Sequence, residues 1–297
     1  MDEWHIGDPV DCGDGFMDAQ NWGRRNVDDE ENDSHNSQNP MERKRDEYSR
    51  KAWNLCNDLR YDDALHYIDM ALNLDSMNAG NWNKKAIILD FMARYEEAEK
   101  CYDTSLGLSS SNLVFDNKAR MLRYWAGNLI EESKKKPDGL ATLYDAWEIN
   151  RRAIDALPGD KSEEDIKNYF NQRDTIEFYI DYEKKYQKNV ETINGYAKSE
   201  LFTISGMQFY RTGINLSAGM ALKLVREQEN EFDRDAIAVY AKGEKIGYVA
   251  NSEYTKYERT SSASELKNEI QSVAQAEYVV YLDRYADIQF AIGRLIK

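Results

Sequence analysis

The sequence predicts an α+β multidomain protein in which an α-helical solenoid precedes a small β-barrel. One helical pattern recurs at an offset of 34 residues in the first half of the chain. Two stretches of the last third instead alternate apolar and polar residues, which is the period of half-buried strands. We therefore expect an acidic disordered tail, helical repeats, a long capping and linking helix, and a barrel, at residues 1–43, 44–160, 161–196 and 197–297.

The length and composition of the chain bound its class. With 297 residues, 41% of them hydrophobic, the chain has room for about two domains of ordinary size. No window approaches the roughly 18 apolar residues of a membrane span, and the N-terminus lacks the order of a signal peptide. We expect a cytoplasmic protein without membrane contact. Cys12, Cys56 and Cys101 are far apart, which predicts neither a disulfide framework nor a structural zinc site.

The negative charge is spread unevenly along the chain. The formal net charge is −15, of which residues 1–40 carry −9 (11 acidic and 2 basic side chains). Residues 200–297 hold 14 acidic and 12 basic side chains and carry only −2. A strongly acidic protein binds nucleic acid poorly in a non-specific way, because it cannot neutralise many phosphates and release their counterions. Any contact with nucleic acid must therefore be local.

The acidic first segment, residues 1–40, is polar and predicted to be disordered. Trp4 and Trp22 nevertheless lie among its Gly-Asp turns. Two interpretations remain open for the tail. It is either a solubilising segment or a peptide that docks on a partner or on the chain's own groove.

The helical repeat is clearest where Tyr61-Asp-Asp-Ala64 recurs as Tyr95-Glu-Glu-Ala98. Small residues in the pattern let two antiparallel helices approach closely, while large apolar residues fill the space between hairpins. This pattern resembles the tetratricopeptide repeat, whose period is about 34 residues. A third copy begins near Asp116, and Pro158 stops its second helix.

An insertion follows the first helix of the third copy. Gly127–Gly139 contains Lys134, Lys135 and Lys136, and we expect an exposed loop there. The alternative is a basic contact point for phosphate. Ser162-Glu-Glu-Asp165 then predicts a helix start, with a hydroxyl cap and an acidic first turn.

Apolar spacing continues the helix that starts after Ser162 until Gly195, so a long helix should cap the repeats. A coiled-coil dimer is an alternative for it, although Arg173 and Glu183 interrupt the apolar seam.

The concave face of the repeats decides what protein they hold. Tetratricopeptide domains that bind chaperone tails clamp a carboxylate with basic and Asn side chains. The matching positions here lack that clamp; they are Ser49, Trp53, Asn83, Ile87, Asp116 and Arg120. We expect a protein partner with an apolar or mixed surface, in a groove lined by Trp53, Asn83, Ile87 and Arg120.

Five strands are predicted in the last third. Leu222 and Leu224 alternate with Lys223 in the first of them. The others should cover Ala236–Tyr240, Lys245–Ala250, Ile270–Leu282 and Asp287–Ile296. A short helix is expected after Ala250 with Ser252 as its N-cap, followed by a loop at Ser261–Ala263. Strands interrupted by one short helix suit a small closed barrel.

Separated blocks of this region resemble the HIRAN domain. They are Phe202-x-x-x-Gly206-x-x-Phe209-Tyr210, Arg226-Glu227, Asn230, Phe232-Asp233, Asp235–Val239 and Ile246–Val249, within Leu201 to Lys297. The resemblance implies an OB-like barrel that captures the 3′ end of single-stranded DNA, as in fork-remodelling helicases, and thereby a role in DNA repair. Aromatic side chains would stack on bases while polar and basic groups hold the terminal hydroxyl and phosphates.

The resemblance also implies roles for particular residues. Phe209 and Phe232 would stack, Asp233 would hold the terminal nucleotide, and Tyr248 with Asn251 would lie near the phosphate. Tyr210 and Arg226 complete the candidate set. The sequence departs from the family at Gln208, Tyr248 and Asn251, where basic residues are missing; Arg211, Arg226, Arg234 and Lys256 are the cations that could compensate. The alternative for Phe209 and Phe232 is a place in the core.

Enzymatic signatures are missing from the sequence. There is no phosphate-binding loop and no Gly-x-Ser-x-Gly elbow, and His5, His35 and His66 are scattered. We expect no catalytic residue, no metal and no cofactor. The carboxylates between Glu227 and Asp235 are interpreted as a solvated loop in which Asp233 caps the turn, with a metal site as the alternative.

The sequence as a whole therefore predicts a non-catalytic adaptor. Its barrel would bind a nucleic-acid end, and its repeats would hold a protein partner. Two alternatives stay open: a pure protein-interaction scaffold without DNA binding, and an accessory subunit of a DNA-processing hydrolase such as a helicase or nuclease.

Overall fold

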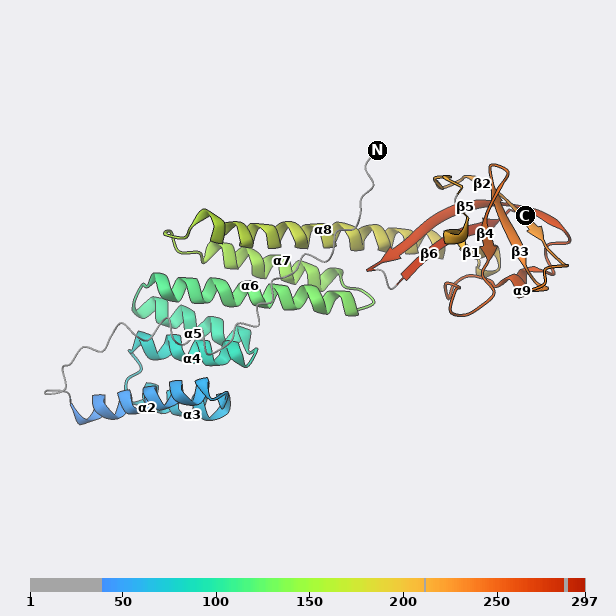
Figure 1. Cartoon of the computed structure of the whole chain (residues 1–297). Coiled ribbons are helices and arrows are strands. Elements are labelled where there is room, and N and C mark those ends of the chain that lie inside the picture. Colours follow the sequence, from blue (N-terminus) through green and yellow to red (C-terminus); the bar gives the residue numbers. More distant parts are fainter. Residues whose placement is uncertain (1–38, 211, 286–287, 297) are drawn as a thin grey trace. The chain divides into compact units, whose positions relative to one another are not determined.

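The computed structural model describes residues 39–210, 212–285 and 288–296, which are drawn in colour in Figure 1. The chain divides into two compact units, Met1–Glu177 and Phe178–Lys297. The four-part division predicted from the sequence remains a prediction. Across the described ranges, no helix has the length and apolar character needed to cross a membrane.

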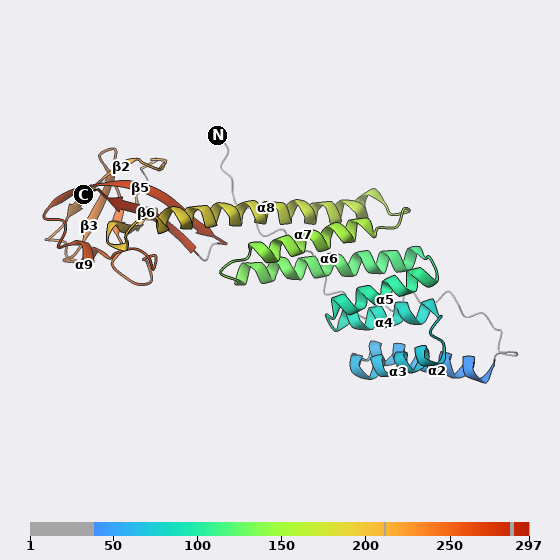
Figure 2. The same ribbon diagram turned by 180° about the vertical axis from the view of Figure 1, so that it is seen from behind.

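Unit 1 consists of stacked helical hairpins (Figures 1 and 2). Its helices are α2 (Pro40–Asn57), α3 (Tyr61–Leu74), α4 (Ala79–Phe91), α5 (Tyr95–Leu108), α6 (Asn112–Lys135), α7 (Leu140–Asp155) and the first part of α8 (Glu163–Asn194). Helices α3 and α5 begin and end 34 residues apart. This spacing confirms the tetratricopeptide-like repeat.

The same packing contact recurs in successive hairpins. The ring of Tyr61 stacks on Phe91 with centroids 5.7 Å apart, and Tyr95 stacks on Trp125 at 5.6 Å. Both partners of the second pair lie 34 residues after those of the first. The small residues that the pattern singled out are all fully buried; they are Ala64, Ala71, Ala86 and Ala98. Helix contacts at close range therefore depend on alanine at these positions.

Enlarging one of these alanines should disturb the packing. Ala64→Leu or Ala98→Leu is expected to lower the free energy of unfolding by about 1–3 kcal/mol, because extra methylenes must enter a closely packed contact. Urea unfolding followed by tryptophan fluorescence measures the change. The control is Lys100→Leu, at an exposed position of α5. Wild-type stability in both alanine variants would show that the assigned repeat register is wrong.

The loop predicted at Gly127–Gly139 is wrong for most of its length. Helix α6 continues to Lys135 and α7 begins at Leu140. Ala126, Ile130 and Ser133 are buried at helical spacing and extend the packed stripe past Gly127. Two of the three lysines of this segment form ion pairs, Lys134 with Glu131 and Lys136 with Glu132, each at 2.7 Å.

Helix α2 begins at Pro40, inside the span assigned to the tail. Asn39 caps it by accepting a hydrogen bond from the Met41 amide at 3.1 Å, and proline suits the first helical position. The remaining tail, residues 1–38, lies outside the described residues. Ser162 caps α8 as predicted, since its hydroxyl accepts the Asp165 amide at 3.1 Å.

Unit 2 contains a closed antiparallel barrel with the strand order β1-β4-β3-β2-β5-β6. Its strands are β1 (Leu201–Ser205), β2 (Ala221–Arg226), β3 (Ile237–Ala241), β4 (Glu244–Val249), β5 (Val273–Arg284) and β6 (Ile288–Leu295). Phe202, Leu224, Ile237 and Val239 are fully buried at its centre. The five strands expected from alternation are all present, and β1 before them completes the barrel.

The segment between β4 and β5 differs from the prediction. Residues 252–255 form a turn and not a helix, because the Ser252 hydroxyl accepts the Tyr254 amide at 3.2 Å. The loop expected at Ser261–Ala263 ends one residue early, because helix α9 (Ala263–Leu266) begins at Ala263, where a capping box between Ser262 and Glu265 starts it.

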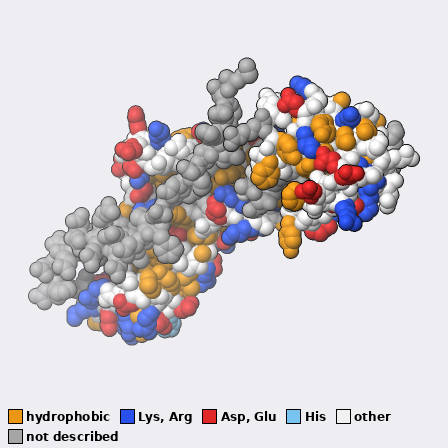
Figure 3. Space-filling view, turned by 45° about the vertical axis from the view of Figure 1, so that its right-hand side comes forward, with side chains coloured by type: hydrophobic (Ala, Val, Ile, Leu, Met, Phe, Trp, Pro, Cys, Tyr) orange, Lys and Arg blue, Asp and Glu red, His pale blue; other side chains and the backbone are white. Residues whose placement is uncertain are grey.

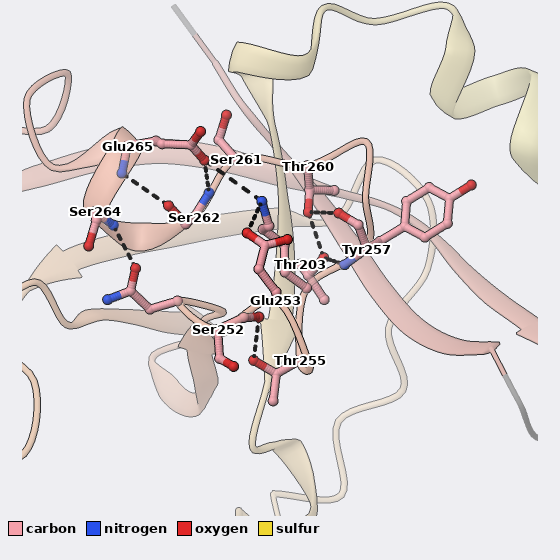
Figure 4. A network of polar contacts seen from close by, with 12 residues as sticks. Thr203, Ser252, Glu253, Thr255, Tyr257, Thr260, Ser261, Ser262, Ser264 and Glu265 are labelled. Carbon is pink, nitrogen blue, oxygen red and sulfur yellow. Dashed lines mark hydrogen bonds and ion pairs between the residues drawn. The ribbon is translucent and has the colours of Figure 1, made fainter.

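Buried hydroxyls hold this segment on β1. The hydroxyls of Thr203 and Thr260 lie 2.8 Å apart, and the Tyr257 amide donates to Thr203 Oγ1 at 3.0 Å (Figure 4). The segment is therefore an ordered part of the barrel wall.

Candidate nucleic-acid interface

The loop between β2 and β3 presents an aromatic ring to solvent. Phe232 is 97% exposed. The amides of Phe232 and Asp233 both donate to Asn230 Oδ1, at 3.0 and 3.1 Å, and the Asp235 amide donates to Asp233 Oδ1 at 2.8 Å. Asp233 thus caps the turn, as predicted. Polar side chains fix the loop backbone, and the ring does not belong to the core.

Asn251 joins this loop to α9. Its Nδ2 donates to Asp233 Oδ2 at 2.9 Å, and its Oδ1 accepts the Ser264 amide at 3.0 Å. Asp235 accepts from the Lys267 ammonium and the Ser264 hydroxyl, which together hold the pKa of its carboxyl below the usual value. Phe232, Asp233 and Asn251, which the sequence placed in one site, therefore lie on one connected surface.

A second cluster surrounds Glu227 at the end of β2. Its carboxylate accepts from Lys245 Nζ at 2.5 Å and from the Tyr248 hydroxyl at 2.9 Å. Lys245 also donates to the Tyr248 oxygen at 3.0 Å, and the ring of Tyr210 lies 6.3 Å from that of Tyr248. Partial burial opposes ionisation of Glu227, but these hydrogen bonds outweigh it and lower its pKa. The hydrogen bonds to Glu227 and Lys245 therefore hold Tyr248 beside the ring of Tyr210.

Phe209 offers another exposed ring. It ends the short helix η2 (Met207–Phe209) and is 79% exposed. Gly206 precedes this helix at φ +73°, a left-handed conformation that glycine adopts without strain. No ring contact joins Phe209 to Phe232 among the described residues. The two rings are separate platforms.

The compensating cations differ in availability. The Lys256 side chain is 5% exposed and lies between Glu253 and Glu265, so the expectation that it could meet phosphate is wrong. Arg226 is half-buried and donates to the Lys267 carbonyl at 3.2 Å. Arg234 is exposed, without an ion pair to the described part of the chain, and it directly follows Asp233. Arg211 lies outside the described residues.

Charge is mixed over the surface, as Figure 3 shows for the described part of one face, where acidic and basic side chains are interspersed. Across residues 39–210, 212–285 and 288–296, no group of His, Cys, Asp and Glu could hold a metal ion. The arrangement can stack and hydrogen-bond a ligand locally, without a broad basic field.

The predicted groove of unit 1 is only partly open. Trp53 is half-buried, and Ile87 is 4% exposed and packs in the core, not in an open groove. Asn117 connects the other two residues, since it donates to Asn83 at 3.2 Å and accepts from Arg120 at 2.9 Å. Asn83, Asn117 and Arg120 thus form a hydrogen-bonded row on α4 and α6.

The comparisons with known proteins concern both units. The first TPR domain of Spaghetti (RPAP3), solved with the HSP90 peptide SRMEEVD, is 14% identical, covers 47% of this chain and 94% of its own, and has a TM-score of 0.31. The Sgt2 TPR domain from Aspergillus fumigatus is 13% identical, covers 50% of this chain and 85% of its own, with a TM-score of 0.32. The comparison with curated proteins finds no match. Residues 199–258 match the family model of the HIRAN domain, which confirms the resemblance inferred from the sequence.

Proposed function

We propose that this protein is a non-catalytic adaptor whose barrel binds the 3′ end of single-stranded DNA while its helical repeats hold a protein partner. The HIRAN match indicates nucleic-acid binding, and the tetratricopeptide-like repeats indicate protein interaction. The observation that carries the finer proposal is Phe232, which is 97% exposed on a loop whose backbone is fixed by Asn230 and Asp233.

A fixed, exposed ring is suited to a base. Stacking of a base on an aromatic side chain is worth about 1–3 kcal/mol and tolerates any sequence, since every base has a π-face. Because the loop around Phe232 is already hydrogen-bonded, little conformational freedom is lost when the base arrives. Phe209 supplies a second platform of the same kind.

The polar groups beside Phe232 favour a free hydroxyl. Each carboxylate oxygen of Asp233 accepts one hydrogen bond within the protein and keeps a further lone pair for a ligand donor. A terminal 3′-hydroxyl can donate to it. A terminal 3′-phosphate would instead bring like charge against Asp233, and the repulsion would weaken binding. Arg234, which is exposed and follows Asp233, would meet an internal phosphate.

The charge of the chain limits the strength of this binding. Residues 200–297 carry −2 and the whole chain −15, so few phosphates can be neutralised. The dependence of log K on log salt should be shallow, at about −0.7 for each phosphate contact with a single strand. Affinity should come mainly from stacking.

The proposed protein partner binds unit 1. The row of Asn83, Asn117 and Arg120 offers amide and guanidinium groups, and the half-buried Trp53 adds apolar surface on α2. Such a surface fits a segment of mixed apolar and polar character.

Removing the ring of Phe232 tests the proposal. Phe232→Ala in the full chain is expected to lower the affinity for single-stranded DNA by about 5- to 150-fold, as loss of one stacked base predicts. Fluorescence anisotropy with a labelled oligonucleotide measures this. The melting temperature should stay unchanged, because the side chain is 97% exposed.

The matched control is Phe178→Ala, which removes a ring that is 62% exposed on α8. It should leave the affinity at the wild-type value. Equal binding by wild type and Phe232→Ala would show that this ring does not stack on the ligand.

A further inference from the structure

The outer face of β2, β3 and β5 is hollowed. A cavity of about 460 Å³ lies there, lined by Lys223, Lys242, Tyr240, Gln275 and Val225 among others. No carboxylate is among its lining residues. Both lysines are exposed, and neither forms an ion pair or side-chain hydrogen bond with the described part of the chain. Two cations therefore line one hollow without a counter-charge from the described residues, in a chain of net charge −15.

The strand register builds this hollow. Lys223 lies directly opposite Tyr240 on β3 and opposite Gln275 on β5. Its neighbours Leu222 and Leu224 are buried inside the barrel, so alternation directs Lys223 outward. Lys242 occupies the two-residue turn between β3 and β4, where positive φ at Lys242 and Gly243 makes the tight hairpin. The lysines are thus held by regular backbone.

Aromatic rings connect the hollow to the candidate interface. Tyr240 pairs with Lys245 on β4. The ammonium of Lys245 lies 6.0 Å from the centroid of Tyr240 and 4.7 Å from that of Tyr248. Tyr248 in turn neighbours Tyr210. We name the row Tyr210, Tyr248, Lys245, Tyr240, Lys223 and Lys242 the tyrosine–lysine track.

We propose that a single-stranded nucleic acid held by its end at the candidate interface continues along the tyrosine–lysine track into the hollow. A base stacks on Tyr240, and phosphates meet Lys223 and Lys242. Lys245 contributes little to phosphate binding, because Glu227 already neutralises it. The inference rests on the proposed function and deepens it, since it extends the footprint beyond the terminal nucleotide.

Charge and shape together favour this occupant. A polyanion is attracted by two cations that no carboxylate of the described residues neutralises. Alternating rings and cations are the arrangement by which single strands are bound without sequence preference, at about 4–16 nucleotides for each OB-type barrel. The half-buried ring of Tyr240, between two lysines, matches this pattern.

Oligonucleotide length provides the test. Full-chain protein is titrated with labelled oligothymidylates of about 4 and about 16 nucleotides, the limits of such sites, across a salt series. Wild type should bind the longer oligonucleotide more tightly and with a steeper salt slope. In the double variant Lys223→Gln/Lys242→Gln, the longer oligonucleotide should no longer bind more tightly than the shorter one. The slope of log K against log salt for the longer oligonucleotide should become shallower by about 0.7 for each lysine. Its affinity for the shorter oligonucleotide should not change.

Two further variants sharpen the test. Tyr240→Ala should weaken binding of the longer oligonucleotide by about 5- to 150-fold. Lys185→Gln/Lys188→Gln removes the same charge from exposed positions of α8 and should change neither affinity. The lysines are exposed and the Tyr240 ring is half-buried, so a melting curve of each variant shows whether it is folded.

The outcomes separate the two proposals. If Phe232→Ala lowers the affinity for both oligonucleotides while Lys223→Gln/Lys242→Gln binds the longer one as tightly as wild type, the track is overturned and the proposed function stands. If wild type binds neither oligonucleotide, the proposed function fails and the track falls with it. If the Lys185→Gln/Lys188→Gln control loses as much affinity for the longer oligonucleotide as Lys223→Gln/Lys242→Gln, the track is also overturned, because net charge alone would then explain the effect.

Discussion

Glu183→Ala is expected to lower the stability of unit 2 by about 3–5 kcal/mol, because it removes one partner of a buried ion pair and takes the Glu183 carboxylate away from the buried Arg284 guanidinium. Glu183 on α8 is fully buried and accepts from Arg284 Nε at 3.1 Å and from the Tyr285 hydroxyl at 3.2 Å. Burial and the Glu183 carboxylate also raise the pKa of Tyr285. Hydrogen exchange of the barrel strands measures the free energy of opening of this unit.

The control replaces both partners. Glu183→Leu/Arg284→Met removes the charges together and should recover most of the stability, since apolar side chains then replace both members of the buried pair. A loss below about 1 kcal/mol in Glu183→Ala, as is typical of exposed pairs, would contradict the burial of this pair.

Phe202→Ala is expected to destabilise the barrel by about 3–5 kcal/mol, because a large buried ring leaves a cavity. Phe202 on β1 is fully buried and lies opposite Gly293 on β6. A side chain at Gly293 would overlap the Phe202 ring, so the glycine makes room for it. Urea unfolding followed by circular dichroism at fixed protein concentration gives the change in stability.

The chain supplies matched controls for Phe202→Ala. Phe209→Ala and Phe232→Ala make the same chemical change at positions that are 79% and 97% exposed. Each should shift the stability by no more than about 0.5 kcal/mol. If all three substitutions lower the free energy of unfolding by a similar amount, Phe209 and Phe232 pack in the core.

Features with a clear periodic signal were predictable. The 34-residue offset identified the helical hairpins, because the same close contacts recur in each repeat, as in Tyr61 with Phe91 and Tyr95 with Trp125. The strand patterns were predictable because the barrel wall has one buried face and one exposed face. Ser162 identified the start of α8 through a local cap.

Features that depend on distant partners were not predictable. Glu183 interrupts the apolar pattern of α8, and its partner Arg284 lies 101 residues away. The extension of α6 past Gly127 depends on packing that overrides the weak helix propensity of glycine. At Ser252, a hydroxyl that could cap a helix caps a turn instead.

The candidate site shows the same division. The resemblance to the family pointed to Phe232, Asp233 and the matching position Asn251, and the structure joins Asp233 to Asn251 by a hydrogen bond. Whether Phe232 was core or exposed could not be decided from the sequence, because an aromatic residue in a loop suits either. The hydrogen-bonded group of Glu227, Lys245 and Tyr248 was missed as a unit. It forms only when β2 and β4 flank β3 in the folded sheet, which brings Glu227 at the end of β2 to Lys245 and Tyr248 of β4.

The most direct test of the central claim is a titration of the full wild-type chain with three labelled ligands of the same sequence. They are a single strand with a 3′-hydroxyl, a single strand with a 3′-phosphate, and a blunt duplex. Tightest binding of the 3′-hydroxyl strand, with a shallow salt dependence, is the predicted result. If none of the three binds at low salt, DNA recognition by the barrel is contradicted, and a protein-interaction scaffold becomes the better explanation of the fold.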